Sequence, residues 1–228
     1  MPAPDDAGTL DGLAYALYEP SDEAVGGVVV LHGADSAKEN HLDFARLCRA
    51  HGLAAVAFDQ RGHGATGGQL DGRVLDDISA MAGLLRRDRP QLAVGLRGSS
   101  MGGFLALAAA EAVRAAAVVA ICPASAEGLQ RAMRTGRFDF PADLVALEAV
   151  LGDVDETAAA ARLGDRLLLL HAEGDEVVPV EHSRAIHEAA PGSRLIAVPG
   201  GHHRSVQHDA ELQAEAVRFL VRRLRAPG

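Results

Sequence analysis

Short apolar runs alternate with amphipathic segments along the chain, and this alternation predicts the fold. Strands are expected at residues 10–18, 27–31, 54–58, 91–96, 116–121, 166–171 and 194–198. Helices are expected near residues 37–51, 74–87, 101–113, 181–190 and 208–225. Strands that alternate with helices form a mostly parallel sheet with helices on both faces, so the pattern predicts an α/β fold. Residues 10–18 alternate polar and apolar positions most clearly, as is typical of an antiparallel edge strand with one wet face.

One segment interrupts this alternation. Residues 124–163 read as a helical insert in what is otherwise a single domain spanning residues 1–228. Its apolar anchors are Leu129, Met133, Phe138, Phe140, Leu144, Leu147 and Leu151. The insert lies between two strands whose ends flank the expected site. This position favours a small lid that covers a substrate pocket, and two ordinary covering helices are the alternative.

Composition narrows the range of functions. The 228 residues are 48% apolar and only 4% aromatic, which predicts an aliphatic core, and the net charge of −9 argues against a nucleic-acid or anionic-membrane surface. Cys48 and Cys122 lie in apolar surroundings and are expected to be buried, reduced thiols. No apolar run approaches the roughly 20 residues of a membrane span, and the N-terminus does not resemble a signal peptide. These features predict a cytoplasmic protein.

Ser100 carries the strongest chemical signal. It is the centre of Gly98-Ser99-Ser100-Met101-Gly102, which follows an apolar strand and precedes a segment rich in helix formers. A G-x-S-x-G sequence in this context predicts a tight strand-to-helix turn that lifts the serine hydroxyl clear of the sheet. The flanking glycines are needed because a Cβ at either position would collide with neighbouring backbone.

A serine hydroxyl needs a base, and the base needs an orienting acid, before it becomes an effective nucleophile. The acid is predicted to be Asp175, with Glu176 and Glu173 as alternatives, because all three follow directly on a strand that ends at His171. The base is predicted to be His202, with His203 as its competitor. Both histidines follow Gly200-Gly201 just beyond another strand end. These loops lie at the same sheet edge as Ser100, so the three groups are expected to converge.

The oxyanion that forms during acyl transfer requires preorganised backbone donors. One is predicted to be the amide of Met101 at the start of the helix, and the other the amide of Ala34 in the loop after residues 27–31. His32, beside this loop, is expected to be a structural side chain and not a second base.

Together these residues resemble the α/β-hydrolase superfamily over nearly the whole chain. The resemblance rests on His32-Gly33, Asp59-Gln60-Arg61-Gly62-His63-Gly64, Gly98–Gly103, Gly174-Asp175 and Gly201-His202. It implies the α/β-hydrolase fold and, by size, a small carboxylesterase, dienelactone-hydrolase-like or acylglycerol-lipase-like member. It also implies that the loop at residues 59–64 shapes the pocket wall without taking part in the chemistry. Ser100 stands where a dienelactone hydrolase would have cysteine, which favours ordinary ester cleavage.

The sequence therefore predicts a serine hydrolase that cleaves small-to-medium carboxylic esters or thioesters through an acyl-enzyme on Ser100. A peptidase or amidase of the same fold and a non-catalytic ligand-binding protein are the alternatives. Residues 62–67 match G-x-G-x-x-G, but more loop glycines follow instead of a helix, which argues against dinucleotide binding. The histidines lack metal-ligand spacing, so neither a metal nor a cofactor is expected.

Overall fold

The computed structural model describes residues 2–152 and 154–225. Its centre is an eight-stranded sheet in the order β1-β2-β4-β3-β5-β6-β7-β8. The strands are β1 (Asp6–Leu10), β2 (Leu13–Tyr18), β3 (Gly26–Leu31), β4 (Leu53–Phe58), β5 (Val94–Ser99), β6 (Ala117–Ile121), β7 (Leu167–Ala172) and β8 (Arg194–Val198). From β4 to β8 neighbouring strands run parallel, and β1 and β2 complete one edge in antiparallel pairing. The expected α/β-hydrolase fold is confirmed.

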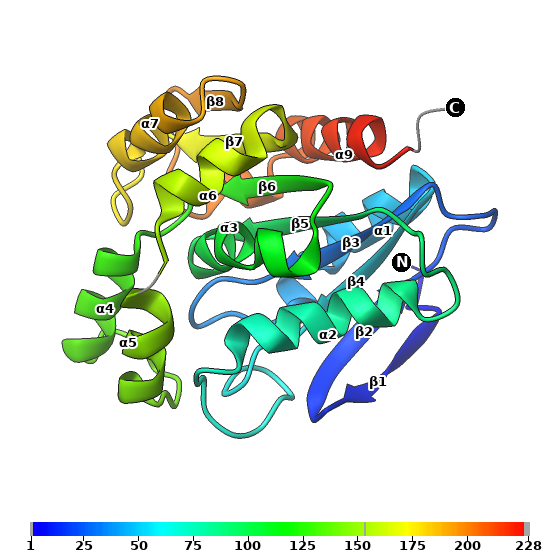
Figure 1. The fold of residues 1–228 in the computed structure, drawn as a ribbon, viewed down its shortest axis with the longest axis horizontal. Helices are drawn as coiled ribbons and strands as arrows, with labels where there is room; N and C mark the ends of the chain where they lie inside the picture. The colour runs from blue at the N-terminus through cyan, green and yellow to red at the C-terminus, as the bar shows by residue number, and fades with distance from the viewer. Residues whose placement is uncertain (1, 153, 226–228) are drawn as a thin grey trace.

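Helices cover both faces of the sheet (Figure 1). They are η1 (Lys38–His41), α1 (Leu42–Ala50), α2 (Val74–Arg86), α3 (Met101–Val113), α4 (Ala126–Arg134), α5 (Leu144–Gly152), α6 (Glu156–Leu163), η2 (Gly164–Arg166), α7 (Val180–Ala189), α8 (Ser205–His208) and α9 (Ala210–Leu224). The apolar faces of α1 and α9 form one core with Val28 and Val30 of β3, whereas α2, α3 and α6 form a second core with Val29 and Leu31. Successive strand residues thus face opposite layers, as the strand period requires.

The N-terminal edge differs from the sequence prediction. The single strand expected at residues 10–18 is a hairpin, in which β1 and β2 pair through a turn at Asp11 and Gly12. Both turn residues have positive φ, 51° and 82°, as a two-residue Asp-Gly hairpin turn requires. The solvent-exposed residues expected for this segment lie in β1, because every residue of β2 is buried.

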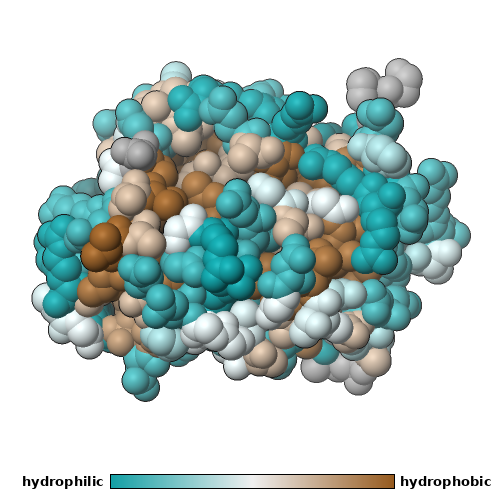
Figure 2. Space-filling view, turned by 60° about the horizontal axis from the view of Figure 1, so that its bottom comes forward, coloured by the Kyte–Doolittle hydropathy of each residue, from teal (hydrophilic) through white to brown (hydrophobic). Residues whose placement is uncertain are grey.

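The insert at residues 124–163 divides into two parts. The helix α6 packs on α3 and α7, so it belongs to the layer that covers the sheet. The helices α4 and α5 pack on each other and lie to one side of that layer (Figure 1). Leu129, Leu147 and Leu151 are buried as expected, but Leu144 is 38% exposed and its neighbour Val145 is 81% exposed. Figure 2 shows apolar surface on the left of the molecule, the side on which Figure 1 places α4 and α5.

Two helical glycines provide a test of the packing around the turn that contains Ser100. A Cβ at Gly102 in α3 would lie 2.5 Å from the backbone oxygens of Leu31 and His32, whereas a Cβ at Gly83 in α2 would meet nothing within 4 Å. Gly83→Ala should therefore raise the free energy of unfolding by about 0.5–1 kcal/mol through helix propensity alone. Gly102→Ala should lower it by more than about 1 kcal/mol, because backbone cannot move aside as a side chain can. Urea unfolding of both variants measures the difference, and equal effects would contradict this packing.

Candidate active site

Ser100 lies on a strained turn between β5 and α3. Its backbone has φ 54° and ψ −120°, and its amide donates to the carbonyl of Ile121 at 2.9 Å. A Cβ at Gly98 would collide with the backbone of Gly102, so the turn closes only with glycine at that position. The serine side chain is half-buried. The elbow predicted from the sequence is present, and the residue in the unfavourable conformation is the predicted nucleophile.

Asp175 is the carboxylate that points inward from the loop between β7 and α7. Its side chain is fully buried, and its Oδ1 accepts hydrogen bonds from the amides of Val177 and Val178, each at 2.8 Å. The two alternatives point elsewhere. Glu173 pairs with Arg184 at 2.9 Å on the surface, and Glu176 Oε2 accepts from the amide of His203 at 3.3 Å.

The histidine paired with this carboxylate is His203, so the prediction of His202 is wrong. His203 Nδ1 lies 2.7 Å from Asp175 Oδ2, and its side chain is 12% exposed. The ring of His202 is exposed, and its Nδ1 accepts from the amide of Arg204 at 3.3 Å. The neutral tautomer of His203 that donates from Nδ1 leaves Nε2 as an acceptor.

Close packing between two loops explains why the second histidine turns inward. The amide of Gly174 donates to the carbonyl of Gly200 at 2.9 Å, and a Cβ at Gly174 would lie 2.5 Å from the carbonyl oxygen of Gly201. Gly200 and Gly201 both have positive φ, 68° and 73°. The chain therefore turns sharply against the β7 loop and presents residue 203, and not residue 202, to Asp175.

His171 is a second imidazole at Asp175, and no sequence motif indicates that it belongs to the site. Its Nε2 lies 2.9 Å from the carbonyl oxygen of Val178 and 3.4 Å from Asp175 Oδ2, while Nδ1 lies 2.7 Å from Ser183 Oγ. Since a carbonyl can only accept, Nε2 carries the proton in this arrangement. The only sequence signal was a histidine at the end of an otherwise apolar strand.

The hydrogen bonds at Asp175 set its charge state. Burial has the largest influence on the pKa of Asp175 and would raise it, but the hydrogen bonds from both imidazoles and from two backbone amides together outweigh burial. The pKa of Asp175 therefore lies well below its usual range, and the group is a carboxylate at neutral pH.

Cys122 lies beside this network, and both cysteines are buried free thiols as predicted. Potential ligand atoms of Cys122, His171 and Asp175 lie within 4.8 Å of one another. Both ring nitrogens of His171 already have protein partners, however, and burial raises the pKa of the Cys122 thiol. Cys122 and His171 therefore support the Asp175 carboxylate by packing and hydrogen bonding, and the three side chains do not fit a metal centre.

The two predicted oxyanion donors flank Ser100. Met101 is the first residue of α3, where the amides of a helix have no intrahelical partner. Ala34 follows Gly33, where a Cβ would lie 3.3 Å from that of Ser100. Among the hydrogen bonds of the described residues, neither amide has a protein acceptor.

The loop that contains Ala34 is held by the loop after β4. His32 is buried, and its Nδ1 lies 2.7 Å from the carbonyl oxygen of Gly33, while Nε2 accepts from the amide of Gln60 at 3.0 Å. The side chain of Gln60 donates back to the carbonyl of His32 at 2.7 Å. His32 is thus a structural side chain, as predicted. In the neutral tautomer with the proton on Nδ1, one ring nitrogen donates to Gly33 and the other accepts from Gln60.

Asp59 holds the other side of this junction. Its carboxylate is fully buried and accepts from the amide and the Nζ of Lys38, both at 2.7 Å, and from the amide of Ala65 at 2.8 Å. Residues 62–67, which match G-x-G-x-x-G, lie in this loop before α2 begins at Val74. The glycine loop therefore does not open into a helix N-terminus, and its geometry does not fit a dinucleotide site.

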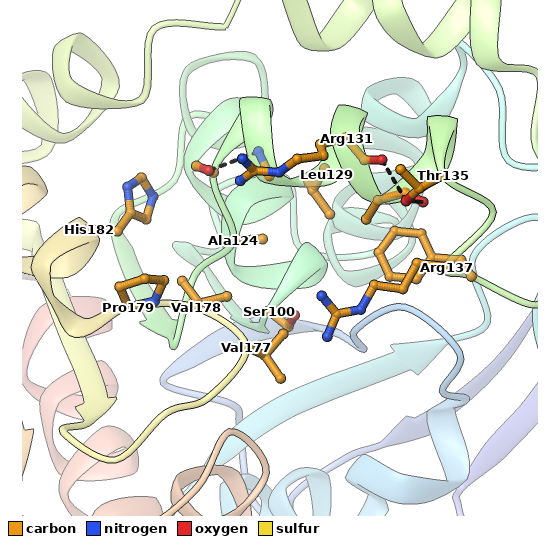
Figure 3. A pocket seen from close by; sticks show the side chains of 14 residues that line it. Ser100, Ala124, Leu129, Arg131, Thr135, Arg137, Val177, Val178, Pro179 and His182 are labelled. Atoms are coloured by element: carbon orange, nitrogen blue, oxygen red, sulfur yellow. Dashed lines mark hydrogen bonds between the residues drawn. The ribbon is translucent and has the colours of Figure 1, made fainter.

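Three hollows meet at Ser100. The first, of about 330 Å³, lies under the insert and is lined by Ser100, Ala124, Ser125, Gly128, Leu129, Arg131, Ala132, Thr135, Arg137, Phe138, Val177, Val178, Pro179 and His182 (Figure 3). The second and third, of about 220 Å³ and 200 Å³, are each lined by both Ser100 and His203. Ser100 therefore borders both the cavity under the insert and the two hollows that His203 lines.

The insert is fixed to the site by contacts at its middle. The amide of Leu70 donates to the carbonyl of Pro141 at 2.9 Å, and the amide of Asp143 donates to the carbonyl of Leu70 at 2.8 Å. The ring of Phe140 packs on that of His63, with 4.1 Å between centroids. The connection between α4 and α5 is thus joined to the loop that also supports His32.

A mostly parallel sheet with a serine on a strained strand-to-helix turn, and an Asp–His pair on later strand ends, defines an α/β-hydrolase of the serine type. The chain belongs to the family described as serine aminopeptidase, S33, whose model matches residues 22–154, more than half of the sequence. A second model, described as TAP-like protein, matches residues 152–224.

Comparisons with individual proteins agree with this assignment. The chain is 30% identical over 101 residues to a monoacylglycerol lipase of Mycolicibacterium smegmatis, a stretch that covers 42% of this chain and 36% of the lipase. A serine hydrolase without a lid from Xanthomonas campestris superimposes with a TM-score of 0.70 at 23% identity, covering 100% of this chain and 99% of the other. A Paleococcus ferrophilus monoacylglycerol lipase gives 0.69 at 19% identity, covering 93% and 98%. At these sequence identities, the likeness to both solved structures is evidence for the fold only.

Within residues 2–152 and 154–225, every helix is too short or too polar to cross a membrane.

The buried His32 predicts how stability depends on pH. Burial lowers the pKa of His32 to about 4, below the 6.5 of an unperturbed imidazole. Below pH 6.5 the unfolded chain therefore binds more protons at this residue than the folded chain does. The free energy of unfolding consequently falls as the pH decreases from 6.5 towards 4. Between pH 7 and pH 5 the free energy of unfolding should fall by about 2 kcal/mol less in His32→Gln than in the wild type.

Urea unfolding at the two pH values measures this difference. The exposed His51 provides the matched control, and His51→Gln should keep the wild-type pH dependence. A His32→Gln variant with the full wild-type pH dependence would show that His32 does not remain neutral in the folded protein.

Proposed function

We propose that the protein is a serine esterase that cleaves carboxylic esters through an acyl-enzyme on Ser100. The observation that carries the proposal is that His203, whose Nδ1 lies 2.7 Å from Asp175 Oδ2, lines two hollows together with the strained Ser100. The family and the likeness to a monoacylglycerol lipase support ester hydrolysis.

In this mechanism Ser100 Oγ attacks the ester carbonyl while His203 Nε2 takes its proton. Asp175 holds the imidazole in the tautomer with the proton on Nδ1 and stabilises the imidazolium that forms. The oxyanion accepts hydrogen bonds from the amides of Ala34 and Met101, which are fixed before the substrate arrives. His203 then protonates the departing alcohol, and water attacks the acyl-enzyme with His203 again as the base.

The lining of the insert cavity favours esters over peptides with a free N-terminus. An aminopeptidase must bind an ammonium group next to the scissile bond, and carboxylates are the groups that do this. Among the residues that the structure describes, the lining of the 330 Å³ cavity includes Arg131 and Arg137 and no aspartate or glutamate. An ammonium in this cavity would meet two guanidinium groups, so the ester is the preferred substrate.

Replacing the nucleophile tests the reaction. Ser100→Ala should abolish hydrolysis of p-nitrophenyl butyrate, with a loss of at least about 10³-fold in kcat/KM. It should also abolish labelling by a fluorophosphonate probe. The thermal melt should stay nearly unchanged, because alanine occupies the same backbone conformation. Folded wild-type protein that the probe does not label would exclude the esterase and favour a ligand-binding protein without catalysis.

The two adjacent histidines give a matched pair of variants. His203→Ala should lower kcat/KM by at least about 10³-fold, because it removes the imidazole paired with Asp175. His202→Ala should retain most of the activity, since the ring of His202 is exposed and its Nδ1 accepts from the amide of Arg204 and not from a group of the site. Initial rates with p-nitrophenyl butyrate compare them. Full activity in His203→Ala would contradict the proposed base.

A further inference from the structure

Arg137 is a cation whose position the proposed reaction does not explain. It lies between α4 and α5 and lines both the 330 Å³ cavity and the 220 Å³ hollow that contains His203. Figure 3 shows its guanidinium extended towards Ser100 from the insert side. Arg137 is an exposed residue of the insert, but its side chain lies over the hollows at Ser100 instead of extending away from them.

The charged side chains around Arg137 leave it without a counterion. In the part of the chain that the structure describes, no carboxylate lies within ion-pair distance of Arg137. The nearby insert arginines do have partners: Arg134 Nε donates to Glu148 at 2.6 Å, and Arg131 lies 3.7 Å from Glu127. Asp35 and Glu176 line the outer hollow with Arg137, but neither forms an ion pair with it; Asp35 accepts from the amide of Asp139, and Glu176 accepts from the amide of His203.

The charge of the cavity is opposite to that of the whole protein. The chain has a net charge of −9, which by itself repels an anionic substrate. The residues that line the insert cavity nevertheless include two arginines, and the remaining basic group, His182, pairs with Glu156 at 3.0 Å. The lining therefore offers guanidinium donors beside apolar contacts from Leu129, Val178 and Pro179.

We propose that Arg137 binds a carboxylate on the ester substrate, so that the enzyme prefers esters that carry a second, negatively charged group. The inference rests on the proposed function and names its substrate class. The planar guanidinium suits a carboxylate because it can donate two parallel hydrogen bonds. The apolar wall would contact the methylene chain between the carboxylate and the ester carbonyl.

Paired esters that differ only in charge test the proposal. Monoethyl succinate, adipate and suberate carry the carboxylate on the acyl side, and each is compared with the ethyl ester of equal chain length that ends in a methyl group. For the alcohol side, 6-acetoxyhexanoate is compared with hexyl acetate. In at least one series the wild type should have the higher kcat/KM for the charged ester, and added salt should reduce this preference.

Variants of Arg137 assign the preference to this residue. Arg137→Gln should lower kcat/KM for the preferred charged ester by about tenfold and change the neutral partner by less than about twofold, since one charge-assisted hydrogen-bonded pair is lost. Arg137→Lys should restore part of the preference. The matched control is Arg134→Gln, which removes a charge from the same insert without altering the cavity lining and should leave the preference intact.

The outcomes separate this inference from the proposed function. If neither ester of any pair is cleaved and the fluorophosphonate does not label Ser100, the esterase itself is excluded. If neutral esters are cleaved but no charged ester is preferred, or if Arg137→Gln lowers both members of a pair equally, the carboxylate subsite is overturned while the esterase stands.

Discussion

The backbone packing at the turn between β5 and α3 is the constraint on which the site depends. Ser100 has φ 54°, and the turn around it closes because Gly98 and Gly102 allow backbone to contact backbone. The same contact brings α3 against the carbonyl oxygens of Leu31 and His32, at the end of β3. This close approach, which requires glycine, therefore positions Ser100, the first amide of α3 and the loop with Ala34 relative to one another. Strain at a functional residue persists because this surrounding packing over-determines it.

A second close approach of backbone brings the remaining groups together. The loops after β7 and β8 contact each other through Gly174, Gly200 and Gly201, and this contact places His203 on Asp175. His171, from the end of β7, contacts the same carboxylate from within the sheet. Asp175 is therefore held by groups from two loops and one strand, which fixes the imidazole of His203 before any substrate binds. A base that is already positioned lowers the free energy of activation of the step in which it takes the proton.

The sequence predicted the sheet, the elbow and the inward carboxylate because each depends on local pattern. Apolar runs mark buried strands, glycines mark the tight turn, and Asp175 stands directly beyond a strand end. The choice between His202 and His203 depends on where the chain points after two residues of positive φ, which is a property of the loop contact and not of the local sequence. The hairpin at Asp11 and Gly12 differs from the prediction for the opposite reason: its turn signal is local, but the alternation across residues 10–18 predicts one strand.

The insert has a defined position relative to Ser100 and to the loop that contains Ala34. Its middle is bonded to Leu70, and Leu70 belongs to the loop whose Gln60 holds His32 in place. The segment that contains Arg137 and the loop that contains Ala34 are thus attached to the same support. A charged group on the insert can discriminate between substrates only if its distance to the scissile bond is defined, because the energy of a charge pair falls steeply when the partners separate in solvent. The shared support fixes this distance, so in the proposed esterase the reaction at Ser100 and the selection of its substrate depend on one set of backbone contacts.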